Sequence, residues 1–253
     1  MTTLKQLHLA IIPDGNRRWA ASRKFNPWKG HKQAIENFRS LTQWCRNDPR
    51  ISILTVWCFS TENWKRDPKE IKMLMKMLED YLIEEQKKFI EKETRFLHSG
   101  RKDRIPFSLA KLIEETEQLT KNQTEFTLNL AVDYGGKDEI LRAIDKMFVP
   151  AAESHGYRLQ RVNQQTPAGH SSKSDGWSKP VNDMLRPFLD HPSLPDIDLV
   201  IRTSGEMRTS NFFLWQSAYA EWMFSQKLFP DFTVNDLAEA VKEYERRGRR
   251  YGT

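Results

Sequence analysis

The chain has 253 residues, of which 38% are hydrophobic and 29% are charged, and its 40 Lys and Arg against 34 Asp and Glu give a formal net charge of +6. This composition excludes a disordered or fibrous chain and is typical of a soluble globular protein with a sizeable core. A mildly basic chain suits several partners, namely nucleic acid, anionic lipid or a phosphorylated small molecule, so charge does not choose among them.

The sequence indicates a cytoplasmic protein. No window approaches the roughly 18 to 20 apolar residues that a bilayer span requires. The N-terminal stretch lacks the small-residue cleavage site of a signal peptide. Cys45 and Cys58 are isolated, without metal or redox spacing, and we expect two reduced thiols.

Strands and helices alternate along the chain. The runs "LHLAII" (7–12) and "ISILTVWCF" (51–59) are short and partly β-branched, which predicts buried strands. Between them, Ala34, Phe38, Leu41 and Cys45 recur on one helical face. Pro68 suits the first turn of a longer helix. That helix is predicted over 68–90, and further helices are predicted over 107–121, 135–148 and 233–250. Further strands are predicted over 126–134 and 197–203.

This alternation predicts an α/β fold with a largely parallel central sheet flanked by helices. Residues 151–180 break the rhythm, since they are polar, lack periodicity and carry Gly, Pro and Ser. We interpret them as a mobile surface insertion within a single domain that spans 1–253.

Four segments carry residues that packing alone does not require. They are "PDGNRRWA" (13–20), "FSTENWKR" (59–66), "IRTSGEMRTSNF" (201–212) and the stretch around Glu221. The first three follow predicted strands, and ligands collect beyond the carboxyl ends of the strands in open α/β sheets. Arginine forks suit phosphate oxygens, and a single carboxylate can hold Mg²⁺ against phosphate. The sequence therefore predicts a phosphate or diphosphate site.

Each motif also has a plain structural interpretation. Asp14-Gly15 alone is usually a turn, and paired arginines are usually a solvated face. Trp19 and Trp64 can be packing residues, and His31 can cap a helix. The prediction depends on the co-occurrence of these motifs at strand ends.

Taken together, the motifs resemble those of the cis-prenyltransferases, typified by undecaprenyl diphosphate synthase. The resemblance lies in "HLAIIPDGNRRWA", "FSTENWKR", "NLAVDYGG" and "DLVIRTSGEMRTSNFFLWQSAYAEW", in this order over nearly the whole chain. It implies a homodimer with a hydrophobic tunnel in each subunit. It also implies a Mg²⁺-dependent condensation of isopentenyl diphosphate with an allylic diphosphate, in which each new double bond is cis.

The resemblance also implies a role for each matching residue. Asp14 would hold Mg²⁺ with Glu221 and assist departure of the allylic diphosphate, and Asn63 would take up the proton. Allylic diphosphate would bind to Gly15, Asn16, Arg17, Arg18 and His31. The substrate site would be completed by Trp19, Ser60, Thr61, Glu62, Trp64 and Arg66. Isopentenyl diphosphate would bind to Arg202, Arg208, Thr209 and Ser210. The tail "RYG" (250–252) would reach the partner's site.

Two departures from the family pattern concern the substrates. An arginine commonly found shortly before Gly30-His31 is absent, and Lys29 or Arg17 is left to supply the charge. The tunnel is expected near Cys58 and Phe126, and bulky Phe126 hints at a shorter product.

Several rivals remain. A related enzyme could make a short or branched product, and a non-catalytic partner subunit could keep the fold. A nucleic-acid-binding module fits the charge alone, but it lacks a motif, and we expect no nucleic acid partner. The sequence contains no Asp-Asp-x-x-Asp cluster, which counts against a trans-prenyltransferase. A long product would bring the protein into transient contact with a membrane, so a peripheral membrane location is an alternative. The basic C-terminal helix would then contact either the membrane or the other subunit of the dimer.

Overall fold

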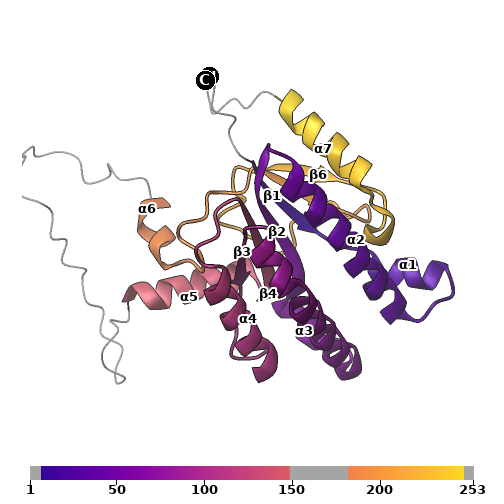
Figure 1. Cartoon of the computed structure of the whole chain (residues 1–253), viewed down its shortest axis with the longest axis horizontal. Coiled ribbons are helices and arrows are strands. Elements are labelled where there is room, and N and C mark those ends of the chain that lie inside the picture. The colour runs from indigo at the N-terminus through magenta and orange to yellow at the C-terminus, as the bar shows by residue number, and fades with distance from the viewer. Residues whose placement is uncertain (1–6, 149–181, 248–253) are drawn as a thin grey trace, which may run out of the picture. The chain divides into compact units, whose positions relative to one another are not determined.

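The computed structural model describes residues 7–148 and 182–247. The expected insertion at 151–180 and the "RYG" tail lie outside these residues. Contacts group the chain into two units, one formed by 1–136 with 195–253 and the other by 137–194. The first unit holds a sheet and the second is helical in its described part (Figure 1).

The sheet of the first unit has six strands, all paired in parallel, in the order β3-β4-β2-β1-β5-β6. This confirms the α/β fold and the parallel sheet. The strands are β1 (Leu7–Ile12), β2 (Ile51–Ser60), β3 (Thr94–Ser99), β4 (Phe126–Tyr134), β5 (Leu199–Arg202) and β6 (Glu221–Phe224). Sequence analysis missed β3, because "TRFLHS" is short and interrupted by polar residues.

β1 and β5 are buried on both faces, as expected of a parallel sheet, whereas the edge strand β6 is only half-buried. In β1, Leu9 and Ile11 belong to one core cluster, whereas Ala10 and Ile12 belong to another. Because successive side chains of a strand point to opposite faces, the two clusters lie on the two sides of the sheet.

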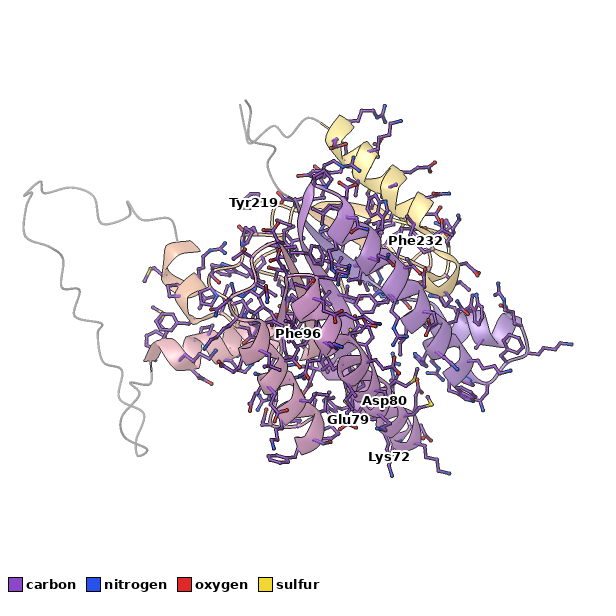
Figure 2. All side chains as sticks on the ribbon, viewed as in Figure 1. Lys72, Glu79, Asp80, Phe96, Tyr219 and Phe232 are labelled. Atoms are coloured by element: carbon purple, nitrogen blue, oxygen red, sulfur yellow. The ribbon has the colours of Figure 1, made fainter. Side chains whose placement is uncertain are left out.

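The first of these clusters also contains residues of the helices that pack against the sheet. Figure 2 shows Phe96 of β3 among these inner side chains, with Lys72 and Asp80 on the outer side of one helix. The helices of the first unit are α1 (Asn16–Ser22), α2 (Pro27–Asn47), α3 (Pro68–Glu91), α4 (Phe107–Thr120) and α7 (Val234–Arg246), with 3-10 turns η1 (Thr61–Lys65) and η3 (Phe229–Asp231).

Local sequence explains where the long helices begin. Asp67 accepts a hydrogen bond from the backbone N–H of Lys69 over 2.7 Å, and Pro68 occupies the first turn of α3. Asn26 and Pro27 begin α2 in the same way. These caps satisfy backbone donors that a helix start would otherwise leave unpaired.

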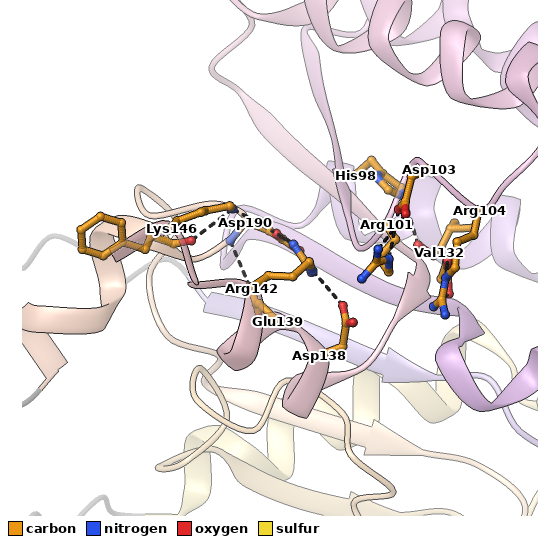
Figure 3. A network of polar contacts seen from close by, with 12 residues as sticks. His98, Arg101, Asp103, Arg104, Val132, Asp138, Glu139, Arg142, Lys146 and Asp190 are labelled. Carbon is orange, nitrogen blue, oxygen red and sulfur yellow. Dashed lines mark hydrogen bonds and ion pairs between the residues drawn. The ribbon is translucent and has the colours of Figure 1, made fainter. Parts of the chain in front are cut away.

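The second unit contains all but the first residue of α5 (Gly136–Phe148), followed by α6 (Asn182–Leu185) and η2 (Arg186–Phe188). Its polar network centres on Arg142 of α5 (Figure 3). The guanidinium donates to Asp138 one turn earlier over 2.7 Å and to Asp190 over 2.8 Å. Glu139 accepts the backbone N–H of Asp190 over 3.1 Å, so α5 is tied to the segment after η2.

In the described ranges, no helix combines the length and the apolar character that a bilayer crossing needs.

Candidate active site

The strand order places a crevice between β1 and β5. From β1 the chain continues to β2 on one side, while β5 and β6 are added on the other side. At such a switch point the connections leave in opposite directions, and ligands bind beyond the carboxyl ends of the strands. Ile12 at the end of β1 pairs with Arg202 at the end of β5. The first and third motifs therefore emerge side by side.

Asp14 and Arg202 form the centre of this crevice. Nη2 of Arg202 donates to Oδ2 of Asp14 over 2.8 Å, and the arginine is 4% exposed. Burial works to raise the pKa of Asp14, but the hydrogen bond and charge of Arg202, with the backbone of Gly15 and the charge of Arg18, hold it below the ordinary 3.8. The carboxylate is ionised at neutral pH.

The turn after Asp14 requires glycine. Gly15 has φ 101°, and a Cβ there would lie 2.8 Å from Cδ2 of Leu228 and 3.0 Å from Cβ of Ser204. Only glycine adopts this conformation without steric cost. The hydroxyl of Ser204 accepts a hydrogen bond of 2.7 Å from Arg18. The close approach of Gly15 and Ser204 therefore also holds the guanidinium of Arg18 in place.

A carboxylate that sequence analysis did not single out lies near two arginines and a histidine. Glu70, in the first turn of α3, has Oε1 3.2 Å from Nη1 of Arg66 and 3.5 Å from Nε2 of His31. Its Oε2 lies 3.9 Å from Nη1 of Arg17. The four-residue step from Arg66 to Glu70 on one chain segment was the available signal.

His31 is neutral at pH 7 in this setting. Burial lowers its pKa below 6.5, Glu70 works to raise it, and the charge of Arg66 lowers it. Its Nε2 is buried and has no hydrogen-bond partner among the described residues, and the same is true of Nε of Arg202. Nε of Arg202 is thus available to a ligand, whereas Nε2 of His31 has the Glu70 carboxylate 3.5 Å away.

The 3-10 turn η1 follows β2 and is fixed by its own side chains. The backbone N–H of Ser60 donates to Oδ1 of Asn63 over 3.1 Å, which closes a capping box. The indole N–H of Trp64 donates to Oδ1 of Asp133 over 2.8 Å, and Arg104 pairs with the same fully buried carboxylate. Asn63 therefore already uses its carbonyl oxygen, and its role as proton acceptor stays a prediction.

The second and third motifs meet through Asn211. Its side-chain amide donates to Oε1 of Glu62 over 3.1 Å. A Cβ on Gly135 would lie 2.6 Å from Oγ1 of Thr61 and 2.8 Å from Nδ2 of Asn211, so the glycine allows this close approach. Asn211 was part of a quoted motif, but its polar side chain alone gave no sign of this bridge.

These elements enclose a cleft of about 920 Å³. The predicted site residues that line it are Asp14, Gly15, Asn16, Arg17, Arg18, His31, Ser60, Glu62, Asn63, Arg66, Arg202 and Ser210. Segments far apart in the sequence therefore converge as expected. Asn211 and Trp57 also line the cleft.

The remaining predicted residues do not line the cleft. Trp19 donates to Asp231 over 2.7 Å, and Trp64 packs edge-on against Phe59 with ring centroids 5.2 Å apart. Arg208 pairs with Glu206, and its carbonyl accepts a hydrogen bond from Arg202. The others behind or beside the cleft are Thr61 at the start of η1 and Thr209, whose carbonyl accepts the N–H of Phe212.

Glu221 is not brought to Asp14 within the described chain. It begins β6 opposite Leu199, whereas Phe224, three residues later, is opposite Arg202. In a parallel sheet this places Glu221 toward the amino ends of the strands. Its Oε2 lies 3.1 Å from Nη1 of Arg247. The predicted pairing of Asp14 and Glu221 as magnesium ligands stays a prediction.

A smaller cavity of about 90 Å³ continues the cleft inward. It shares Pro13, Asn16, His31, Cys58 and Leu74 with the cleft and is otherwise apolar. Its deeper walls are formed by Ala34, Ile35, Phe38, Val56, Met77, Leu78, Tyr81, Leu130 and Phe229.

Phe126 does not line this cavity. It begins β4, is 1% exposed, and lies 5.9 Å from the guanidinium of Arg46. Cys58, by contrast, lines both the cleft and the cavity. The hint of a shorter product drawn from Phe126 therefore finds no support in the position of that side chain.

The chemistry of Asp14 fits Mg²⁺ when substrate phosphates supply further oxygens. Its Oδ2 accepts from Arg202, while Oδ1 lies 3.6 Å from Nη2 of Arg18. The side chain keeps 32% of its surface exposed toward the cleft. Mg²⁺ is bound in such sites by one or two carboxylates together with phosphate oxygens and water, and Asp14 offers one such carboxylate.

Comparison with known proteins identifies a family that the chain matches over most of its length. Residues 12–252 match the family described as "Putative undecaprenyl diphosphate synthase". An isoprenyl transferase of Wolinella succinogenes is 40% identical over 256 residues, covering 100% of this chain and 99% of the relative.

Two solved structures share the fold over nearly their whole length. Lavandulyl diphosphate synthase of Lavandula x intermedia, in complex with dimethylallyl diphosphate, has a TM-score of 0.83 at 32% identity and covers 99% of both chains. A probable undecaprenyl diphosphate synthase of Campylobacter jejuni has a TM-score of 0.73 at 30% identity and covers 100% of both.

Proposed function

Because the chain belongs to the cis-prenyltransferase family of undecaprenyl diphosphate synthase, we propose that it condenses isopentenyl diphosphate with an allylic isoprenyl diphosphate to give a Z-polyprenyl diphosphate. The observation that carries this proposal is the contact of Asp14 with Arg202 in a cleft that continues into an apolar cavity. Such a site offers cations to diphosphates and apolar walls to a prenyl chain.

The chain's own cations stabilise the departing allylic diphosphate. Breaking the carbon–oxygen bond leaves negative charge on the diphosphate, and donors fixed before the reaction stabilise that charge as it develops. Arg17 and Arg18 are proposed for this task, with Nε2 of His31 as a further donor. Mg²⁺, when bound through Asp14, supplies Lewis-acid stabilisation of the same charge.

The second diphosphate is proposed to bind at the end of β5. Arg202 is held by Ser210, whose hydroxyl accepts from Nη1 over 2.8 Å, and its Nε remains unpartnered among the described residues. Arg208 is 63% exposed in its side chain and pairs with Glu206, and a phosphate is proposed to replace that carboxylate. The alkene of isopentenyl diphosphate then attacks the allylic cation, and proton loss, with Asn63 as the proposed acceptor, forms the new double bond.

Mass analysis of products from labelled isopentenyl diphosphate tests this proposal. With Mg²⁺ and allylic primers of different lengths, we expect a ladder of products that differ by single isoprene units. A chain that consumes neither substrate would contradict the proposal and would revive the non-catalytic partner subunit.

A second candidate is a single condensation that gives a short or branched product. It is favoured by the similarity in fold to lavandulyl diphosphate synthase. The cavity of about 90 Å³ beyond the cleft is small, which is also in keeping with a short chain. A product that stops after one condensation would establish this alternative.

The assembly and location are part of the proposal. We propose a homodimer of single-domain subunits, in which each apolar cavity extends into a tunnel when a product grows. We also propose a cytoplasmic protein that contacts the membrane transiently, because its prenyl product is hydrophobic. Light scattering of the purified chain tests the dimer, because a mass near 29.8 kDa would contradict it.

A further inference from the structure

The connection between α1 and α2 carries an uninterrupted exposed surface. Residues 21–29 are all exposed, and Ala21 and Pro27 among them also line the cleft. From Gly15 to Ile35 the chain has six Lys or Arg and no Asp or Glu. We name the surface formed by residues 23–29 and Lys32 the basic-aromatic patch. It lies in the first unit, at the outer ends of α1 and α2 (Figure 1).

Two aromatic rings project from this patch. Phe25 is 43% exposed and Trp28 is 40% exposed. Phe25 also packs on Trp19, with ring centroids 6.1 Å apart, so part of its ring serves the fold. No such contact is found for Trp28 among the described residues. Its position in the first turn of α2 points instead to a partner outside the chain.

The lysines of the patch are not neutralised. Among the described residues, no carboxylate lies within ion-pair distance of Lys24, Lys29 or Lys32. Lys29 lies over the ring of Phe25, 4.5 Å from its centroid, and Lys32 stands one helical turn after Trp28 on the same face. Arg23 differs, because it pairs with Asp231.

The turn that presents the patch is rigid. The N–H of Phe25 donates to the carbonyl of Ala20 over 2.8 Å, and that of Lys24 donates to Ala21 over 3.0 Å. These two bonds form a Schellman ending of α1, in which the left-handed residue is normally glycine. Here that residue is Lys24, with φ 56°. Lysine adopts this conformation less readily than glycine does, so the charge at this position is carried at some cost to the turn.

We propose that the basic-aromatic patch docks the protein on an anionic lipid surface. Lysines near such a surface each strengthen binding, and a tryptophan settles at the headgroup level with its ring among the acyl chains. Neither nucleic acid nor an acidic protein accounts as well for an indole on a helix end beside apolar residues. The apolar cavity lies between α2 and α3 and is lined by Ile35 and Leu74 near the starts of both helices. If the proposed function holds, docking here places a prenyl chain next to the bilayer.

Flotation of the full chain with lipid vesicles tests the docking without substrate. We expect binding to vesicles of phosphatidylcholine with about one third phosphatidylglycerol and none to pure phosphatidylcholine, and loss of binding at about 0.5 M salt. Lys24→Gln with Lys32→Gln should weaken binding about 25-fold, since each lysine near an anionic surface is worth about fivefold. Trp28→Ser should weaken it roughly tenfold.

The matched control removes the same charge elsewhere. Lys111→Gln with Lys121→Gln, at exposed positions on and just after α4, should leave binding unchanged. An equal loss in this control would overturn the proposal, because net charge alone would then drive binding. Failure of the wild type to bind anionic vesicles would overturn it as well, as would binding to DNA that Trp28→Ser leaves intact.

Lys24→Gly distinguishes a role of Lys24 in lipid docking from a role in stabilising the turn. Glycine suits the left-handed position, so we expect a melting temperature about 2 °C higher together with weaker vesicle binding. Weaker binding with a lower melting temperature would assign Lys24 to the fold instead. Because vesicle binding needs no turnover, a chain that binds but makes no product would refute the proposed function and leave the docking intact.

Discussion

Arg202 and Asp14, 188 positions apart in the chain, are joined by a hydrogen bond of 2.8 Å across the ends of β5 and β1. The arginine is buried and the carboxylate is partly open to the cleft. Arg202 is also held by Ser210 and by the carbonyl of Arg208. The contact therefore links the loop after β1 to the loop after β5.

Asp14→Asn tests the link between this contact and turnover. The amide keeps the shape and can still accept from Arg202, but it cannot supply a charged oxygen to Mg²⁺. We expect turnover to fall at least about 100-fold, with a circular dichroism spectrum like that of the wild type. Full activity of the variant in the presence of Mg²⁺ would contradict the assignment.

The same variant gives a test by pH. The pKa of Asp14 in the folded state lies below 3.8 because of Arg202, so its stabilising contribution is present above 3.8. It is lost as pH falls through the lowered pKa. Urea unfolding should therefore show the wild type and Asp14→Asn converging in stability below pH 3.8. A constant difference down to pH 2 would mean that Asp14 ionises with its ordinary pKa.

Glu70→Gln removes the carboxylate that gathers Arg66, His31 and Arg17. Because this carboxylate competes with a diphosphate for the same cations, we expect inorganic pyrophosphate to bind several-fold tighter by calorimetry. The pKa of His31 should fall further, since Glu70 works to raise it.

A charge-matched control on the same helix is Glu79→Gln, whose partner Lys76 is exposed. It should leave pyrophosphate binding unchanged. Weaker binding in Glu70→Gln would show that the carboxylate instead holds the cations in place for the ligand.

Asp133→Asn tests a positioning residue behind η1. Asp133 is fully buried, has φ 51°, and accepts from both Trp64 and Arg104. The amide keeps the bond to the indole but weakens the pair with Arg104, so we expect lower stability with kcat largely retained. Trp64→Phe removes only the indole donor, and we expect it to lower kcat through displacement of Asn63.

The two variants separate a structural from a positioning role. Equal loss of stability and unchanged kcat in both would restrict Asp133 to the fold. Thermal melting and steady-state kinetics with both substrates provide the readouts.

Product length should depend on Phe38 and Tyr81. Their rings lie 5.2 Å apart, and both line the apolar cavity. Phe38→Ala should shift the products to longer chains, because close-packed walls do not admit further isoprene units. Phe126→Ala is the contrasting variant: it should destabilise the protein by about 3–5 kcal/mol and leave product length unchanged. Mass spectra of the products distinguish the two, and a longer product only in Phe126→Ala would contradict the cavity assignment.

His8 should make the protein sensitive to acid. Burial lowers the pKa of His8 from 6.5 to about 4, while Pro195 and Asp198 work to raise it. The unfolded chain takes up this proton below pH 6.5, but the folded chain does so only near pH 4. Stability should therefore fall by up to about 3 kcal/mol between these values. Urea unfolding of the wild type and of His8→Gln between pH 6.5 and pH 4 tests this, because the variant should not show this loss of stability.

Local sequence determined most of the secondary structure. The strands β1, β2 and β4 and the helices α2, α3 and α4 were predictable because their apolar periodicity and their caps agree. It also determined the kind of chemistry, since Asp14, Arg18 and Arg202 stand at strand ends. β3 was not found, because a short strand with polar residues owes its pairing to its neighbour β4 rather than to its own pattern.

Only the tertiary structure decided which side chains share a site. Strand order brings Arg202 to Asp14 at the carboxyl ends of β5 and β1. Glu221 lies at the amino end of β6, because the residue opposite Arg202 is Phe224, three residues later. Asn211 reaches the cleft, and Glu70 reaches His31 and Arg17 beside it, through packing between distant segments. Of these contacts, only the four-residue step from Arg66 to Glu70 is visible in the sequence. Sequence patterns report local geometry, whereas convergence of distant loops is a property of how strands are ordered and helices pack.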